Sequence, residues 1–277
     1  MTWRELAAEG STLLQEAGID SPAFDAKELL LFVSGMEKRD YLLRSGEEAD
    51  AGKEEDYRCL IRRRVLREPL QYIIGEAPFY GRSFIVRPGV LIPRFDTETL
   101  VEAVLPYTAP GKRILDLCTG SGCILLTLLL EGAEGMQGTG TDLSSDALGT
   151  ARLNAAKFSL NPELYQGDLF AAADGKYDII TSNPPYIPTD VIQTLDPEVR
   201  DFEPHTALDG DADGLLFYRR IVDAAPKHLT EHGLLAMEIG YDQGESVPAL
   251  MEESFTDVRV IRDLSGLPRA VLGLKKN

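Results

Sequence analysis

A chain of 277 residues, 44% of them hydrophobic, has enough apolar side chains for one large domain and one smaller one. Its formal net charge of −17 argues against a protein that binds nucleic acid through phosphates, which needs a basic surface. No apolar run approaches the roughly 18 to 20 residues of a membrane span, and the N-terminus lacks a signal-peptide pattern, so we expect a cytoplasmic protein. The three cysteines form no C-x-x-C pair and the three histidines are scattered, so we expect neither disulfides nor a metal site.

Residues 1–75 have the apolar spacing of helices. Ser21 and Pro22 match the N-cap and first turn of one of these helices. Five arginines between residues 58 and 67 form the basic face of another, and this face is either solvated or in contact with a partner. We therefore predict a small helical domain over residues 1–75.

A β-hairpin is predicted next, because residues 71–86 alternate apolar side chains with Gly75, Pro78 and Gly81 after Pro69 ends the helical region. Residues 76–88 are the predicted linker. Residues 89–277 then form the predicted catalytic domain.

From Arg113 onward, strand-like and helix-like segments alternate, which predicts a doubly wound α/β sheet. The predicted strands are residues 113–118, 136–143, 164–166, 177–182, 234–239, 258–263 and 270–274, and the predicted helices are residues 123–131, 145–158, 215–229 and 244–252. Only about six residues separate the last two strands, whereas a parallel crossover needs about a dozen. The terminal strand should therefore be antiparallel.

The first strand of this region runs through a glycine-rich loop directly into a helix, a junction where a ligand can approach the backbone. The loop matches neither the dinucleotide fingerprint nor the phosphate loop of nucleotide hydrolases. We predict that its residues bind a cofactor: Cys118, Thr119, Gly120, Ser121 and Gly122.

Acidic residues follow the next two strands. Asp142, followed by Leu143, ends the second strand, where a carboxylate can accept both hydroxyls of a ribose, although it can also cap the next helix. Asp168 leaves the third strand and can meet an adenine amino group while Leu169 packs on the ring, or it can simply form a turn. We predict that all four residues contact the cofactor.

The motif Asn183-Pro184-Pro185-Tyr186 follows the fourth strand, at the sheet edge where doubly wound folds place their sites. An amide nitrogen is a poor nucleophile because its lone pair is delocalised into the carbonyl. The Asn183 side-chain oxygen and the Pro184 carbonyl can orient such a nitrogen by accepting its hydrogens, and Tyr186 can stack on a planar group. With a sulfonium methyl in line, this arrangement predicts N-methylation with S-adenosylmethionine (SAM) as cofactor, and Asn183 is expected to contact the cofactor as well as the substrate.

Together with this motif, three further segments resemble the HemK/PrmC family of release factor glutamine N5-methyltransferases, and the resemblance covers nearly the whole chain. These segments are REPLQYIIG (residues 67–75), LIPRFDTE (91–98) and DFEP (201–204), in the same order as in the family. The resemblance implies methylation of the glutamine in the Gly-Gly-Gln loop of class 1 peptide chain release factors, with S-adenosylhomocysteine as product and no direct binding of nucleic acid.

The resemblance also implies that the helical domain of residues 1–75 receives the release factor, and it implies roles for individual residues. Thr119, Gly120, Gly122 and Asp142 bind SAM, Leu169 flanks its adenine, residues 183–186 hold the glutamine, and Arg94 borders the substrate pocket. This sequence departs from the family pattern at Cys118, which replaces the usual first loop glycine, and at Phe95, which replaces a proline. Leu169 replaces a larger aromatic residue that some members have.

Three other functions fit parts of the pattern. Asn-Pro-Pro-Tyr also serves enzymes that methylate adenine N6 in DNA or RNA, but the acidic charge argues against them. A glutamine methyltransferase acting on a ribosomal protein is an alternative that the sequence separates poorly. A non-catalytic SAM-binding module is disfavoured by the intact Asn183.

Overall fold

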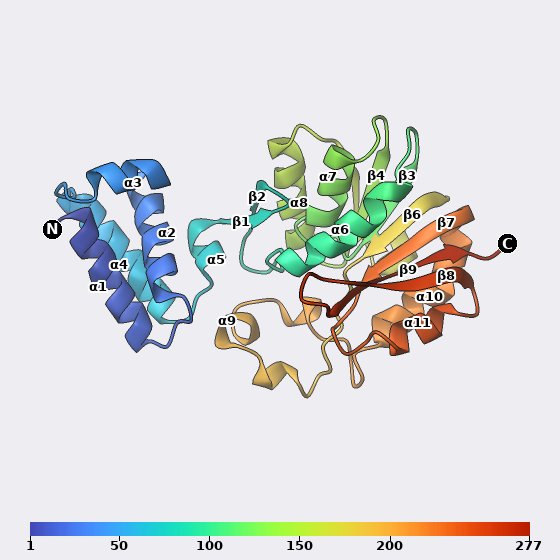
Figure 1. Ribbon diagram of the computed structural model, residues 1–277. Coiled ribbons are helices and arrows are strands. Elements are labelled where there is room, and N and C mark those ends of the chain that lie inside the picture. Colours follow the sequence, from blue (N-terminus) through green and yellow to red (C-terminus); the bar gives the residue numbers. More distant parts are fainter. The chain divides into compact units, whose positions relative to one another are not determined.

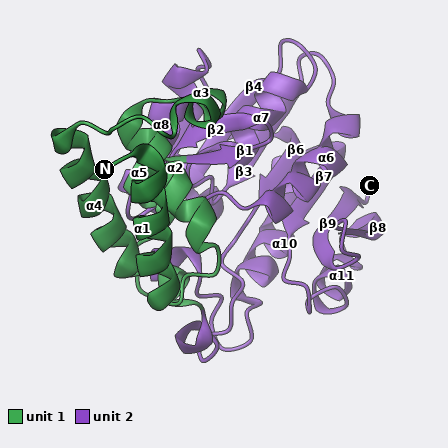
Figure 2. Cartoon of the chain, turned by 60° about the vertical axis from the view of Figure 1, so that its left-hand side comes forward, with its two compact units in different colours: residues 1–76, 196–202 green, residues 77–195, 203–277 purple.

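The chain is described here by a computed structural model over residues 1–277, in which two units can be distinguished (Figure 1). Unit 1 consists of Met1–Glu76 and Asp196–Phe202, and unit 2 consists of Ala77–Leu195 and Glu203–Asn277 (Figure 2). The short segment 196–202 therefore belongs to unit 1 although the residues on both sides of it belong to unit 2.

No helix in this chain is both long and apolar enough to cross a lipid bilayer. The assignment of residues 1–75, 76–88 and 89–277 to separate functional domains stays a prediction.

Unit 1 is built from helices around an apolar core that includes Leu6, Leu14, Leu29, Leu30 and Ile61. These helices are α1 (Trp3–Glu16), α2 (Pro22–Ser34), α3 (Lys38–Arg44), α4 (Ala51–Val65), α5 (Leu70–Ile74) and α9 (Pro197–Arg200). Ser21 and Pro22 stand at the predicted start of α2, but the Ser21 side chain makes no capping hydrogen bond.

The predicted start of the β-hairpin at residue 71 is wrong, because residues 71–74 belong to helix α5. Pro69 stands at the N-cap, and Gly75 ends the helix with a φ of 84°, a left-handed conformation that glycine adopts readily. Leu70 and Ile73 lie three residues apart and enter the core of unit 1. The hairpin itself is limited to β1 (Glu76–Phe79) and β2 (Arg82–Ile85), which form a two-stranded sheet.

Arginines of α4 and the residues after it pair with acidic side chains rather than forming one free basic face. The pairs are Arg58 with Glu9 and Glu54, Arg62 with Glu55, Arg63 with Glu68, Arg64 with Asp25 and Glu198, and Arg67 with Glu198. The solvated-face interpretation is wrong for Arg64, whose side chain is only 8% exposed. Its guanidinium donates to Asp25 at 2.7 Å and to Glu198 of α9 at 2.9 Å. This network fixes segment 196–202 within unit 1.

Substituting Asp25→Ala should lower the free energy of unfolding by about 3 kcal/mol, since it leaves the buried Arg64 with an incomplete set of acceptors. Burial raises the pKa of Asp25 despite the adjacent guanidinium, which indicates how poorly this site is solvated. Urea unfolding checks the prediction. Arg62→Ala is the control, because it breaks an exposed ion pair and should leave the stability nearly unchanged. Equal stability of the Asp25→Ala variant and the parent would contradict a structural role for the network.

Unit 2 contains a seven-stranded sheet with the strand order β5-β4-β3-β6-β7-β9-β8. Its strands are β3 (Arg113–Leu117), β4 (Gln137–Asp142), β5 (Glu163–Gln166), β6 (Tyr177–Ser182), β7 (Leu229–Glu238), β8 (Phe255–Arg262) and β9 (Pro268–Lys275). The predicted doubly wound α/β sheet with an antiparallel terminal strand is confirmed: β9 is antiparallel to both of its neighbours. The sequence did not indicate that β9 lies between β7 and β8 rather than at the edge.

Helices cover both faces of this sheet (Figure 1). They are α6 (Glu98–Val104), α7 (Cys123–Glu131) and α8 (Ser145–Lys157) on one face and α10 (Leu216–His228) and α11 (Ser246–Met251) on the other. Because side chains alternate along a strand, Ile179 packs on the first face and Ile180 on the second. This two-sided burial explains the nearly continuous apolar runs of the central strands.

Short 3₁₀ helices join several of these elements: η1 (Phe95–Thr97), η2 (Leu105–Tyr107), η3 (Leu169–Ala172), η4 (Ile192–Thr194) and η5 (His205–Ala207). Strands β3, β4, β5, β6 and β7 are parallel, so their carboxyl ends share one edge of the sheet. The residues after these ends form the site.

Candidate active site

The loop between β3 and α7 turns sharply, with positive φ angles at Cys118 (56°), Gly120 (56°) and Gly122 (80°). Left-handed backbone suits glycine, so the geometry explains why a glycine is usual at the first of these positions. In this chain Cys118 adopts that conformation, and its side chain lines the cavity described below. The departure from the family pattern therefore places a thiol, rather than a bare backbone, at this wall.

Asp116, two residues before Cys118, holds the loop from beneath. It is fully buried and accepts hydrogen bonds from the hydroxyls of Thr119 and Thr181, both at 2.7 Å. Burial raises the pKa of Asp116 to about 7, because the charged form is poorly solvated there. These bonds join the loop after β3 to the neighbouring strand β6.

Asp142 holds the same loop from β4. Its Oδ2 accepts from the Gly120 backbone N–H and its Oδ1 from the Ser144 N–H, both at 2.8 Å. Ser144, not Asp142, caps α8 by accepting from the Ala147 N–H at 3.2 Å. The capping alternative for Asp142 therefore does not apply. Each carboxylate oxygen has lone pairs left for a ligand hydroxyl, and burial raises the pKa of this group.

Beyond β5, Asp168 and Leu169 also reach the cavity. The Asp168 carboxylate accepts from Arg220 at 2.7 Å in an exposed ion pair, so it is not free to bind a ligand without competition. Leu169 is buried with a φ of 52° and presents an apolar surface.

Asn183 and Pro185 of the predicted catalytic motif line the same cavity, whereas Pro184 and Tyr186 do not. The Tyr186 side chain packs against the apolar core below the sheet, and its backbone carbonyl accepts from Gln243 at 3.2 Å. Burial raises the pKa of the Tyr186 phenol well above its usual range, so it stays neutral. In this conformation the Tyr186 ring therefore does not face the cavity, where a substrate could stack on it.

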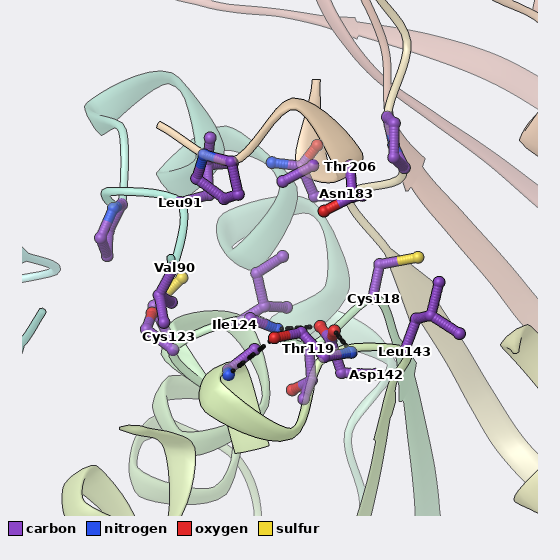
Figure 3. A pocket seen from close by; sticks show the side chains of 18 of the residues that line it. Val90, Leu91, Cys118, Thr119, Cys123, Ile124, Asp142, Leu143, Asn183 and Thr206 are labelled. Carbon is purple, nitrogen blue, oxygen red and sulfur yellow. Dashed lines mark hydrogen bonds between the residues drawn. The ribbon is translucent and has the colours of Figure 1, made fainter. Parts of the chain in front are cut away.

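The cavity encloses about 340 Å³, within the range of small-molecule sites. In Figure 3, Asn183 and Thr206 lie together, apart from Thr119 and Asp142. All cofactor residues predicted from the sequence line it except Gly122, which stands at the N-cap of α7 and packs near Leu126. Arg94 lines it as well and pairs with the buried Glu203.

Several lining residues were not predicted from the sequence as site residues. They include Val90, Ile92, Cys123, Ile124, Ala147, Thr206, Ala207 and Phe217. Most are apolar and read as ordinary core positions, so no local signal distinguishes them. Thr206 and Ala207 follow the segment DFEP, whose resemblance to the family was the available hint.

Thiol reactivity should separate the cysteines. Burial raises the pKa of Cys118 well above its usual range and that of Cys123 to about 12, whereas Cys59 is exposed. Since the thiolate is the reactive form, an alkylating reagent at pH 7.5 should modify Cys59 at least about tenfold faster than the other two. Mass spectrometry of timed samples measures this, with Cys59→Ser as control. Equal rates of modification at all three cysteines would mean that Cys118 and Cys123 are accessible to solvent, which would contradict their burial.

Comparisons with known proteins agree with this geometry. Residues 5–75 match the model of the PrmC N-terminal domain, and residues 92–195 match that of the methyltransferase small domain. A solved methyltransferase from Pyrococcus furiosus shares the fold with a TM-score of 0.54 and 17% identity, covering 78% of this chain and 98% of that one.

Relatives of higher identity match almost the whole chain. The release factor glutamine methyltransferase of Geobacter sulfurreducens is 38% identical over 94% of this chain and 92% of its own length. That of Caulobacter vibrioides is 41% identical over 95% of this chain and 92% of its own length. The chain therefore belongs to the release factor glutamine methyltransferase family.

Proposed function

We propose that this chain transfers a methyl group from SAM to the N5 side-chain amide nitrogen of the glutamine in the Gly-Gly-Gln loop of class 1 peptide chain release factors. The observation that carries the proposal is that Asn183 and Pro185 line the same cavity as the glycine-rich loop and Asp142. Asn183, one of the two acceptors that would orient the amide, thus shares one cavity with the residues proposed to hold the cofactor.

The residues present fit SAM as the cofactor. Asp142 offers carboxylate lone pairs to a ribose, Leu143 and Leu169 offer apolar surface to an adenine, and the backbone around Gly120 leaves room for close approach. A Cβ atom added at Gly120 would come no closer than 4.0 Å to any neighbouring atom, so there is open space beside the loop at this position. When bound, SAM supplies an electrophilic sulfonium methyl group. The carboxylate of Asp142, which lines the cavity, favours a cationic ligand.

The work of the chain's own residues is to orient a planar amide. The Asn183 side-chain oxygen and the Pro184 carbonyl accept the two N–H groups of the substrate glutamine, which turns its nitrogen lone pair toward the cofactor side. Prolines at 184 and 185 remove backbone N–H donors that would compete for these acceptors. No strong base is needed, because the nitrogen becomes acidic only as the new bond forms. Positioning of this kind suffices for a large rate effect.

We also propose that residues 1–75 receive the body of the release factor. The relatives that carry release factor in their names match this chain over most of its length, and residues 5–75 match the PrmC N-terminal domain. Because the five arginines of residues 58–67 are already paired with acidic side chains, exposed apolar side chains are better candidates for the contact than a basic face. Those of this region include Phe24, Phe32, Leu42, Leu43 and Leu66.

The test is transfer of labelled methyl from SAM to a purified class 1 release factor, compared with a release factor whose Gly-Gly-Gln glutamine is replaced by alanine. Label that appears on the first and is absent from the second supports the reaction and the residue together. Label on both proteins would contradict the glutamine assignment. Label on neither, with label on ribosomal proteins in the same assay, would overturn the release factor as substrate.

A further inference from the structure

A buried glutamate, Glu238 at the carboxyl end of β7, lies next to the catalytic motif without belonging to any part of the site described so far. The parallel register pairs Thr181 with Ala236 and Ser182 with Met237. Continuing it by one residue sets Asn183 beside Glu238. Because side chains alternate along β7, Glu238 points to the sheet face that Ala236 and Ile179 share.

Glu238 is almost completely enclosed, with a relative exposure of 3%. The neighbouring side chains of Thr97 and Asn183 stabilise its charged form, while Oε2 has no hydrogen-bond partner. The strand is fixed at this residue by the Tyr218 hydroxyl, which donates to the Glu238 backbone carbonyl at 2.8 Å. A buried carboxylate with an unpartnered oxygen is destabilising for the fold, so a functional reason for it is worth testing.

We propose that Glu238 is a positioning residue that fixes the orientation of the Asn183 amide. A carboxylate can only accept, so it selects the Nδ2 end of that amide. The two ends of an amide point in opposite directions, and Oδ1 is thereby left for the N–H of the substrate glutamine. Without this constraint, a flipped Asn183 would present donors to an amide nitrogen that needs an acceptor. The inference rests on the proposed function.

Protonation of the Glu238 carboxyl should remove its control over the orientation of the Asn183 amide. Burial raises the pKa of Glu238 to about 7; the neighbouring Thr97 and Asn183 side chains and the charge of Arg269 lower it, and Asp96 raises it. Above this pKa the group is an acceptor for Asn183. Below it the carboxyl carries its own O–H donor, which competes for Oδ1. Methyl transfer should therefore fall as the pH drops through about 7.

The kinetic experiment compares the parent with Glu238→Gln and Glu238→Met in the full chain. We expect kcat to fall about 10- to 100-fold in Glu238→Met, which removes the acceptor, with KM and SAM affinity within about threefold of the parent. Glu238→Gln, which can accept or donate, should lie between them. Glu231→Gln is the matched control, since this exposed glutamate lies on the same strand. An unchanged kcat in Glu238→Met would overturn the proposal.

The pH profile of kcat is the second readout. The fall in kcat as the pH drops through about 7 should be present in the parent and absent from both Glu238 variants. Burial also raises the pKa of Asp116 to about 7. If kcat still falls near pH 7 in the variants, the fall belongs to Asp116 and contradicts the proposal.

A measurement without substrate separates this inference from the proposed function. In ¹⁵N spectra, the Asn183 side-chain amide, assigned with Asn183→Ala, should shift with pH in the parent and not in Glu238→Gln. If this shift is seen while no release factor is methylated, the substrate assignment fails and the positioning contact stands. If release factor is methylated but the chemical shift of the Asn183 side-chain amide changes neither with pH nor with the Glu238 substitutions, the positioning role is wrong.

Discussion

Asn183→Ala is expected to lower kcat for methyl transfer to a release factor by at least about 100-fold, the loss typical of removing one preorganised group that acts on the reacting atoms. The substitution removes the side-chain oxygen that orients the substrate amide. SAM affinity should change by less than about threefold, because the glycine-rich loop and Asp142 are untouched. Single-turnover methylation measures the first quantity and calorimetric titration the second.

The matched control for Asn183→Ala is Asn161→Ala, an exposed asparagine that does not line the cavity near Asp142. Its kcat should equal that of the parent. Thermal unfolding must show that the Asn183→Ala variant is folded, since this side chain also meets Glu238. A folded variant that retains full turnover would remove Asn183 from the chemistry.

Much of unit 2 was predictable because its signals are local. Residues 113–117 form an apolar run that meets a glycine-rich loop, and the helix from Cys123 to Glu131 begins and ends as predicted. The antiparallel hairpin between β8 and β9 follows from the shortness of their connection. The insertion of β9 beside β7 was not predictable, since pairing of strands distant in sequence leaves no periodic mark on either one.

Errors in the prediction of unit 1 have a similar cause. Helix α5 has only five residues, too few for a 3.6-residue period to stand out from the alternation of a strand. The arginines of α4 showed their spacing but not their partners, and Glu198 comes from a segment far along the chain. In the sequence, Glu238 is a single acidic residue at the end of an apolar strand, and nothing local marks it as a site residue. Its closeness to Asn183 results from the register between β6 and β7.

Asp142→Ala is expected to weaken SAM binding by about 100-fold, the equivalent of about 3 kcal/mol from two hydrogen bonds to a charged acceptor. The carboxylate already accepts from the N–H groups of Gly120 and Ser144, so its loss also loosens the loop that faces the cofactor. Calorimetric titration with SAM measures the dissociation constant. At saturating SAM, kcat should recover to within about tenfold of the parent, because the amide-orienting motif is intact.

The contrast between Asp142 and Asp168 makes this test specific to position rather than to negative charge. Both line the cavity, but Asp168 is exposed and already paired with Arg220. Its replacement by alanine should weaken SAM binding by about tenfold or less, the range of an exposed charged contact. If the two variants lose equal affinity, the cavity attracts SAM by its overall charge and the ribose assignment of Asp142 is wrong. If Asp142→Ala loses turnover at saturating SAM as completely as Asn183→Ala, cofactor binding and amide orientation are not separate tasks of separate residues.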